Sequence, residues 1–214
     1  LLTYIDIQEE AQKQQLFGET NAKSAIRTFF PLLKKIGFVN YDDTFRANEC
    51  FTELGILFVL ACRAINNVSD KTPHKDIVLE RLVNIKQCAQ KQGLVEMYLN
   101  KEYENHNMWV ALKLLKAFTI INWNYFLYAL HCLEIGFSLD DAIEEIKKVK
   151  DQIDTITFVN EEGEKLPNTC YSYIRSFLEE AGIIKKVGSK ESALVNPSDK
   201  IFTIITLSLI HISE

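Results

Sequence analysis

Few residues in this sequence have the type and spacing that catalysis requires. Carboxylates near a lysine can hold a divalent metal ion that activates water, and the nearest examples are Glu145 with Lys147 and the pair Asp42-Asp43. Residues two apart on a helix point in different directions, and adjacent aspartates are typical of a hairpin turn. We therefore expect no catalytic residue and no metal ion in this chain.

Histidine and cysteine give no stronger candidate for catalysis or for zinc binding. His106 could exchange protons, but its place between two expected helices favours an exposed histidine. His131 and Cys132 are neighbours on an expected helix, so their side chains diverge. The five cysteines are widely separated, lie in apolar surroundings and form no C-x-x-C pair. This pattern favours buried thiols in a reducing cytoplasm, without zinc or another cofactor.

The composition describes a folded chain without the positive charge that attracts nucleic acid in bulk. Hydrophobic residues make up 47% of the 214 positions, enough for a buried core in one or two domains. The formal net charge is −5, so any contact with a polyanion must be local. The longest apolar run, residues 55–61, is far shorter than the ~20 residues of a membrane-spanning helix. We expect no contact with a membrane.

The clearest amphipathic helix lies at residues 21–36. Its apolar residues recur at the spacing of one helix face, and Gly37 suits the left-handed position that ends a helix. Residues 38–41 and 45–51 then form the arms of an expected hairpin, and Thr52 caps the apolar helix that follows. The opposite face of the first helix carries six polar residues: Lys23, Ser24, Arg27, Thr28, Lys34 and Lys35.

A turn-rich linker at residues 66–73 leads into a long helical stretch. Gly93 and Gly136 stand where helix stops are expected, and Ser138 begins a capping box. The stretch therefore predicts five helices, at about 74–92, 94–103, 107–119, 122–135 and 139–152.

A second helix followed by a glycine and a hairpin lies near the C-terminus. The helix begins at Thr169 and ends at Gly182, and its hairpin arms are expected at residues 183–187 and 200–206, joined by a polar loop. When Gly37 is aligned with Gly182, the apolar positions of the two helices coincide. The two segments therefore share one plan of helix, glycine and β-ribbon.

These two segments resemble the recognition helix and wing of the winged helix-turn-helix superfamily. The resemblance rests on residues 24–39 and 169–184. Phe51 to Gly55 is also similar to the family's exit from the wing into its last helix.

The resemblance implies a mainly α fold with small β-hairpins as wings. Two winged-helix-like units, residues 1–66 and 139–206, would be joined by a helical connector, residues 67–138. Paired wings on such a connector are also similar to the recognition parts of some restriction enzymes and phage-defence proteins.

The function that this resemblance implies is binding of double-stranded DNA without catalysis. A recognition helix enters the major groove while the wing touches phosphates. In the first segment Arg27 suits a bidentate contact to guanine, and Lys23 suits a phosphate. Ser24 and Thr28 suit either base or phosphate. The second segment offers an equivalent set, expected to be exposed or near the wing: Thr169, Ser172, Arg175, Ser176, Lys185, Lys186 and Lys190.

Two alternatives stay open. Residues 138–214 hold nine basic and fourteen acidic side chains, and an acidic field repels phosphate. The chain could instead be a helical interaction module whose wings dock a protein partner or a second copy. It could also be the non-catalytic part of a nuclease whose catalytic domain lies in further sequence.

Both ends suggest a piece of a longer reading frame. The chain opens at Leu1 rather than methionine. Residues 207–214 resemble a translated sequencing-adapter end, and we expect them to be an artefactual tail.

Overall fold

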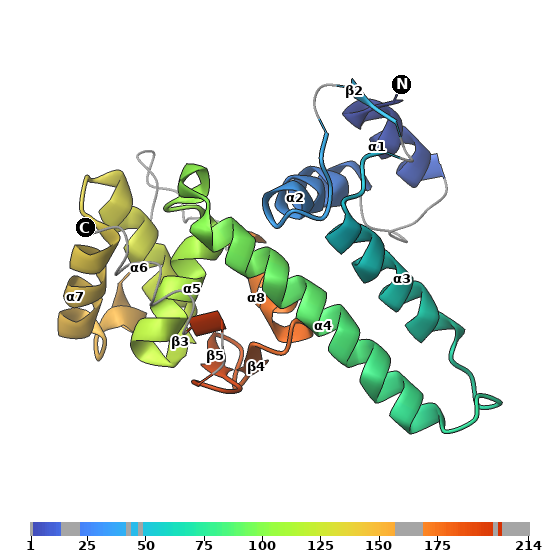
Figure 1. The fold of residues 1–214 in the computed structure, drawn as a ribbon. Coiled ribbons are helices and arrows are strands. Elements are labelled where there is room, and N and C mark those ends of the chain that lie inside the picture. Colours follow the sequence, from blue (N-terminus) through green and yellow to red (C-terminus); the bar gives the residue numbers. More distant parts are fainter. Residues whose placement is uncertain are drawn as a thin grey trace, which may run out of the picture. The chain divides into compact units, whose positions relative to one another are not determined.

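The computed structural model describes residues 2–13, 22–41, 44–46, 49–156, 169–198 and 201–202, with the backbone alone at 2–4, 8, 11, 22–28, 44–45 and 169–170. The described chain is mainly helical and carries a small three-stranded antiparallel sheet, which confirms the predicted class (Figure 1). It divides into two compact units, Leu1–Met97 (unit 1) and Tyr98–Glu214 (unit 2).

Unit 1 is built from helices with short β pairings. Its elements are β1 (Leu2–Thr3), α1 (Tyr4–Lys13), α2 (Ala22–Lys35), β2 (Thr44–Phe45), α3 (Glu53–Asn67) and most of α4 (Lys75–Leu99). Among the described residues of the expected hairpin after Gly37, the two arms share one antiparallel bridge, between Val39 and Phe51. Its expected second arm begins with β2, which pairs with β1 instead. Thr52 caps α3 as predicted, accepting a hydrogen bond from the Gly55 amide at 3.0 Å.

The predicted helix stop at Gly93 is wrong. One helix, α4, runs through this position, and Gly93 is buried inside it. A Cβ on Gly93 would stand 2.4 Å from the carbonyl oxygen of Ile36, so the missing side chain lets α4 approach the end of α2. The glycine serves close packing between helices rather than helix termination.

Unit 2 contains the other helices that the sequence predicted. Its elements are the short 3-10 turn η1 (Lys101–Tyr103), α5 (Asn107–Phe118), β3 (Ile120–Asn122), α6 (Trp123–Glu134), α7 (Leu139–Val149), η2 (Ile153–Thr155), α8 (Thr169–Glu180), β4 (Ile184–Lys186) and β5 (Glu191–Leu194). Gly136 ends α6 with a positive φ of 91°, and Ser138 caps α7 through the Asp141 amide at 3.1 Å, both as predicted. The core gathers fully buried side chains such as Leu114, Phe126 and Ile146.

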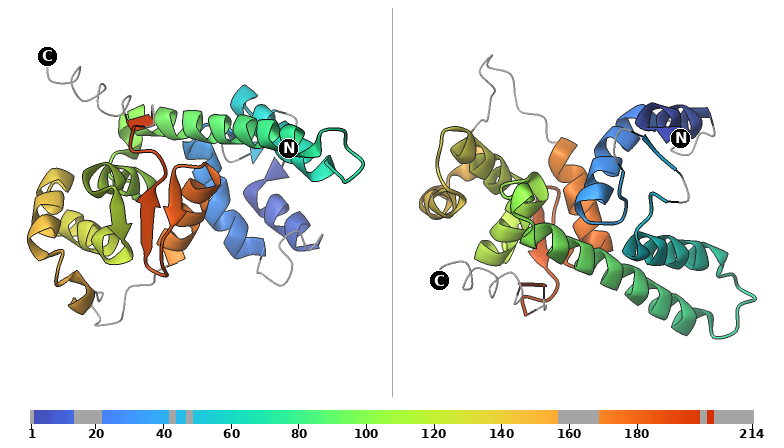
Figure 2. Two further views of the ribbon diagram at one scale, coloured as in Figure 1. Left: turned by 90° about the horizontal axis from the view of Figure 1, so that it is seen from below. Right: turned by 45° about the horizontal axis from the view of Figure 1, so that its top comes forward.

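The sheet of unit 2 has the order β3-β5-β4, with β5 antiparallel to both neighbours (Figure 2). The predicted return arm at residues 200–206 is wrong, because the strand that pairs with β4 is Glu191–Leu194. Ser192 is fully buried in this strand, so a segment that reads as a polar loop belongs to the sheet. The third strand, Ile120–Asn122, comes from the expected helical connector and joins it to the hairpin.

Candidate nucleic-acid interface

Helix α8 ends in a motif that turns the chain directly into the ribbon. The Ile183 amide donates to the Leu178 carbonyl at 3.0 Å, and the Gly182 amide donates to the Glu179 carbonyl at 2.9 Å. Gly182 has a φ of 67°, which a residue with a side chain adopts only at a cost. Strand β4 therefore begins two residues after the glycine, and the β4–β5 hairpin, here called the ribbon, follows α8 at once.

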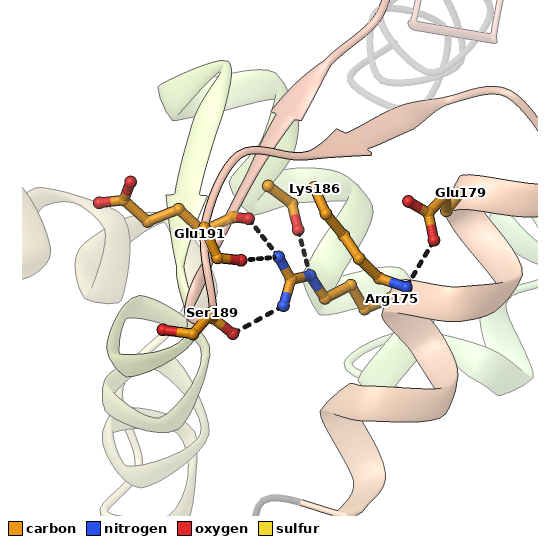
Figure 3. A network of polar contacts seen from close by, with 7 residues as sticks. Arg175, Glu179, Lys186, Ser189 and Glu191 are labelled. Atoms are coloured by element: carbon orange, nitrogen blue, oxygen red, sulfur yellow. Dashed lines mark hydrogen bonds and ion pairs between the residues drawn. The ribbon is translucent and has the colours of Figure 1, made fainter.

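A single arginine of α8 fixes the turn of this ribbon (Figure 3). Arg175 donates from Nε to the Ser192 hydroxyl at 2.8 Å and from Nη1 to the Ser189 carbonyl at 2.7 Å. Its Nη2 donates to the carbonyls of Gly188 and Glu191 at 2.6 and 2.5 Å. The guanidinium thus joins one side chain and three backbone acceptors, which sets the path of the chain between β4 and β5.

The sequence predicted an exposed Arg175, and that prediction is wrong. The residue retains only 8% exposure, because it lies on the side of α8 that faces the ribbon. Tyr171 and Leu178, one turn before and one turn after Arg175 on the same helix face, are buried. The apolar residues at these two positions were the sequence signal for a buried Arg175, and the prediction overlooked it. Carbonyls of the turn replace water around the guanidinium, so Arg175 is no longer a candidate for contacting a base.

The start of α6 contacts the turn of the ribbon and carries an aromatic side chain that packs against α8. Trp123 donates its backbone amide to the Lys190 carbonyl at 2.8 Å, which ties the start of α6 to the turn. Its ring lies 4.2 Å from that of Tyr171, measured between centroids. Burial raises the pKa of Tyr171, while Ser192 and the charge of Arg175 act in the opposite direction. The turn of the ribbon is therefore bonded to α6 at a residue whose ring packs on Tyr171 of α8.

Three lysines of the ribbon, Lys185, Lys186 and Lys190, are exposed and differ in their surroundings. Lys186 pairs with Glu179 of α8 at 2.5 Å, and this contact lowers the pKa of the carboxyl group (Figure 3). Lys185 and Lys190 form no ion pair with any residue in the described part of the chain. Their charges are therefore the ones that the ribbon offers to an anionic partner. Ser172 is exposed on α8.

In unit 1 the candidate residues divide between the two halves of α2. Lys23, Ser24, Arg27 and Thr28 lie on its first half, where their side chains are outside the described residues. Lys34 is half-buried and donates from Nζ to the Tyr41 carbonyl at 2.5 Å, with its ammonium 4.7 Å from the centre of the Tyr41 ring. The prediction that Lys34 lies on a solvent face is thus wrong. Burial also lowers the pKa of Lys35.

The weak catalytic candidates have structural partners. The Met108 amide donates to His106 Nδ1 at 3.5 Å, so this histidine caps α5. Glu145 pairs with Lys148, and Lys147 pairs with Glu144. Asp42 and Asp43 lie outside the described residues.

Neither a metal site in the described residues nor a matching protein points to a function of this chain. Across the described residues, no three His, Cys, Asp or Glu side chains come together as metal ligands, and no described helix is long and apolar enough to cross a membrane. No protein-family model, curated protein or solved structure matches this chain.

Proposed function

We propose that this protein binds double-stranded DNA through α2 of unit 1 and through α8 and the ribbon of unit 2, with unit 2 forming a winged helix-turn-helix domain. The element order supports this assignment: α5, β3 and α6 precede the α8 helix, and β5 returns between β3 and β4. In such a domain the last helix faces the major groove and the ribbon lies along the phosphates.

The observation that carries the proposal is the Arg175-fixed turn beside exposed Lys185 and Lys190. A turn that is ordered before binding loses little conformational freedom when it meets a ligand. Two lysines on such a ribbon, one in β4 and one in the turn, can neutralise neighbouring phosphates and release counterions. This local charge can act even though the whole chain carries a net charge of −5.

The two segments would contribute differently. The exposed face of α8 presents Ser172, Ser176 and Glu180, and the described part of this face has no guanidinium to read a base. Unit 2 would therefore hold the DNA backbone. Base contacts fall to the first half of α2, which carries Lys23, Ser24, Arg27 and Thr28. A place in a restriction or phage-defence system is proposed only from the resemblance of the paired wings.

Fluorescence anisotropy with a labelled duplex at several salt concentrations tests the proposal. Replacing Lys185 and Lys190 by alanine should weaken binding to all duplexes alike. It should also reduce the slope of log affinity against log salt by about two. The matched control replaces Lys101 and Lys150, two exposed lysines of unit 2 outside the ribbon, and should leave the slope unchanged. The absence of salt-dependent binding by the unaltered protein would refute the proposal.

A second measurement separates the two segments. Arg27→Ala should reduce the preference between duplexes of different sequence, by about 1–3 kcal/mol at the base that it contacts. The lysine variant of the ribbon should keep that preference. Equal loss of affinity on every duplex with Arg27→Ala would remove the assignment of base contacts to α2.

A further inference from the structure

Helix α3 of unit 1 carries an apolar stripe that no described residue covers. Ile56, Leu57 and Leu60 are 48%, 44% and 56% exposed, and their spacing places them on one face of the helix. Gly55 and Ala61 of the same helix are buried. The helix therefore packs through part of its surface and leaves large apolar side chains in water on another part, which is typical of an interaction surface.

The first half of α4 has the same character. None of residues 75–88 is buried, and Ile77, Val83 and Ile85 are among the exposed large apolar side chains. These three positions point in different directions around the helix, so α4 has no single solvent face. This half of α4 therefore adds exposed apolar side chains to unit 1.

Two charges flank the stripe on α3 in a self-complementary way. Glu53 lies at one end and Arg63 at the other, and both are exposed. Neither forms an ion pair with any residue that the structure describes. In two antiparallel copies of α3 centred on residue 58, Ile56 lies opposite Leu60 of the other copy. The same register sets each Glu53 opposite an Arg63.

We propose that α3 is a self-association surface and that its occupant is the α3 stripe of a second copy of this chain. A two-fold interface brings the same patch from both copies together, so each contact occurs twice. One apolar centre with opposite charges at its two ends meets this requirement without any other sequence. The exposed apolar residues of α4 would add to the buried area, since a standard interface buries about 800 Å² per partner. The proposal does not depend on DNA binding.

Sedimentation equilibrium of the whole chain without DNA, from roughly 1 to 200 µM, tests the proposal. The unaltered chain should pass from monomer to dimer in this range. Leu60→Glu and Leu57→Glu should each weaken dimerisation at least tenfold, because each buries two unpaired carboxylates. Ile135→Glu, at a residue 59% exposed in unit 2, is the matched control and should dimerise normally.

A charge exchange tests the register. Arg63→Glu should weaken the dimer severalfold, because two glutamates then face each other on both sides of the axis. Adding Glu53→Arg should restore most of the affinity, and circular dichroism should confirm that α3 stays helical. A chain that is monomeric throughout the range overturns the proposal. So do Leu60→Glu and Ile135→Glu variants that behave alike, or a double variant no better than Arg63→Glu.

Discussion

In unit 1 the chain that leaves α2 passes between two glycines of other helices. A Cβ on Gly55 of α3 would stand 1.9 Å from the Phe38 carbonyl oxygen, and one on Gly93 of α4 would stand 2.4 Å from that of Ile36. In unit 2 the chain that leaves α8 is held by the Arg175 guanidinium. Unit 1 thus combines close backbone packing with separate hydrogen bonds, such as the one from Lys34 to the Tyr41 carbonyl, whereas in unit 2 one guanidinium makes several hydrogen bonds to the turn.

The difference arises at one position of the repeated plan. Phe30 and Arg175 each stand seven residues before the glycine that ends their helix. The ring of Phe30 lies 4.9 Å from that of Tyr41, whereas Arg175 bonds to the turn of the ribbon. A phenylalanine ring has no hydrogen-bond donor for the carbonyls of a turn, whereas a guanidinium can donate to several carbonyls at once. The ordered β4–β5 ribbon of unit 2 is the result.

The largest effect is expected from removing the guanidinium. Arg175→Met should lower the free energy of unfolding of unit 2 by about 3 kcal/mol, because it leaves buried acceptors of the turn without donors. Both tryptophans of the chain, Trp109 and Trp123, lie in unit 2, so their fluorescence during urea unfolding reports on this unit. Arg175→Lys should recover only part of the loss, since an ammonium lacks the planar fork. A loss below about 1 kcal/mol for Arg175→Met would contradict the role given to hydrogen bonds.

A smaller effect is expected from filling a glycine contact in unit 1. Gly93→Ala should cost about 2 kcal/mol, since the new methyl group meets the Ile36 backbone rather than a movable side chain. Far-UV circular dichroism during urea unfolding measures the change. Gly188→Ala is the control, because a Cβ there has nothing within 4 Å. Equal stability of the two variants would show that close backbone packing does not support unit 1.

Apolar periodicity and capping residues sufficed to predict most helices. Residues 107–119 and 122–135 were predicted as helices and appear as α5 and α6 with nearly the same ends. Both patterns act over one or two turns, so the sequence carries them locally. Gly93 was misread because a glycine that ends a helix and one that admits a neighbouring helix look alike until the neighbour is known.

The site was predicted less well than the helices, because its contacts join distant residues. Arg175 meets Ser192, seventeen residues further along, and β3 joins β5 across more than sixty residues. Hydrophobic patterning gives no information on such pairings. The lysines expected near the wing are exposed on the ribbon, since a charged side chain without a buried partner stays in water.

The shared helix stop should respond alike in both segments. Gly37 and Gly182 have φ values of 70° and 67°, and each is followed by an amide that donates to the carbonyl five residues back in the same motif. Alanine at either position should cost about 1 kcal/mol, because the left-handed conformation strains a residue with a Cβ. Circular dichroism reports the change at Gly37, and tryptophan fluorescence reports that at Gly182. If the two alanine substitutions lower the free energy of unfolding by clearly different amounts, the two glycines do not have equivalent roles in ending their helices.

The smallest expected effect is a dependence on pH that only unit 2 should show. Lys34 and Glu179 occupy the same position before their glycines, and Tyr41 corresponds to Lys186. In both units this pair joins the helix to the segment that follows its glycine, but Lys34 bonds to a backbone carbonyl, whereas Glu179 pairs with an ammonium group. The pairing lowers the pKa of Glu179, so its contribution to stability is present above the carboxyl pKa of the unfolded chain. That contribution is lost as the pH falls through the lowered pKa of the folded state.

Titration of the Glu179 carboxyl by NMR measures this effect directly. Lys186→Ala should return the pKa of Glu179 towards its ordinary value, with little change in the free energy of unfolding, because both side chains are well exposed. Lys185→Ala removes the same charge from the neighbouring residue and should leave that pKa lowered, since Lys185 does not pair with Glu179. If both variants shift the titration equally, the lowered pKa reflects the general field of the ribbon. The contact between positions 179 and 186 would then be no counterpart of the bond between Lys34 and Tyr41.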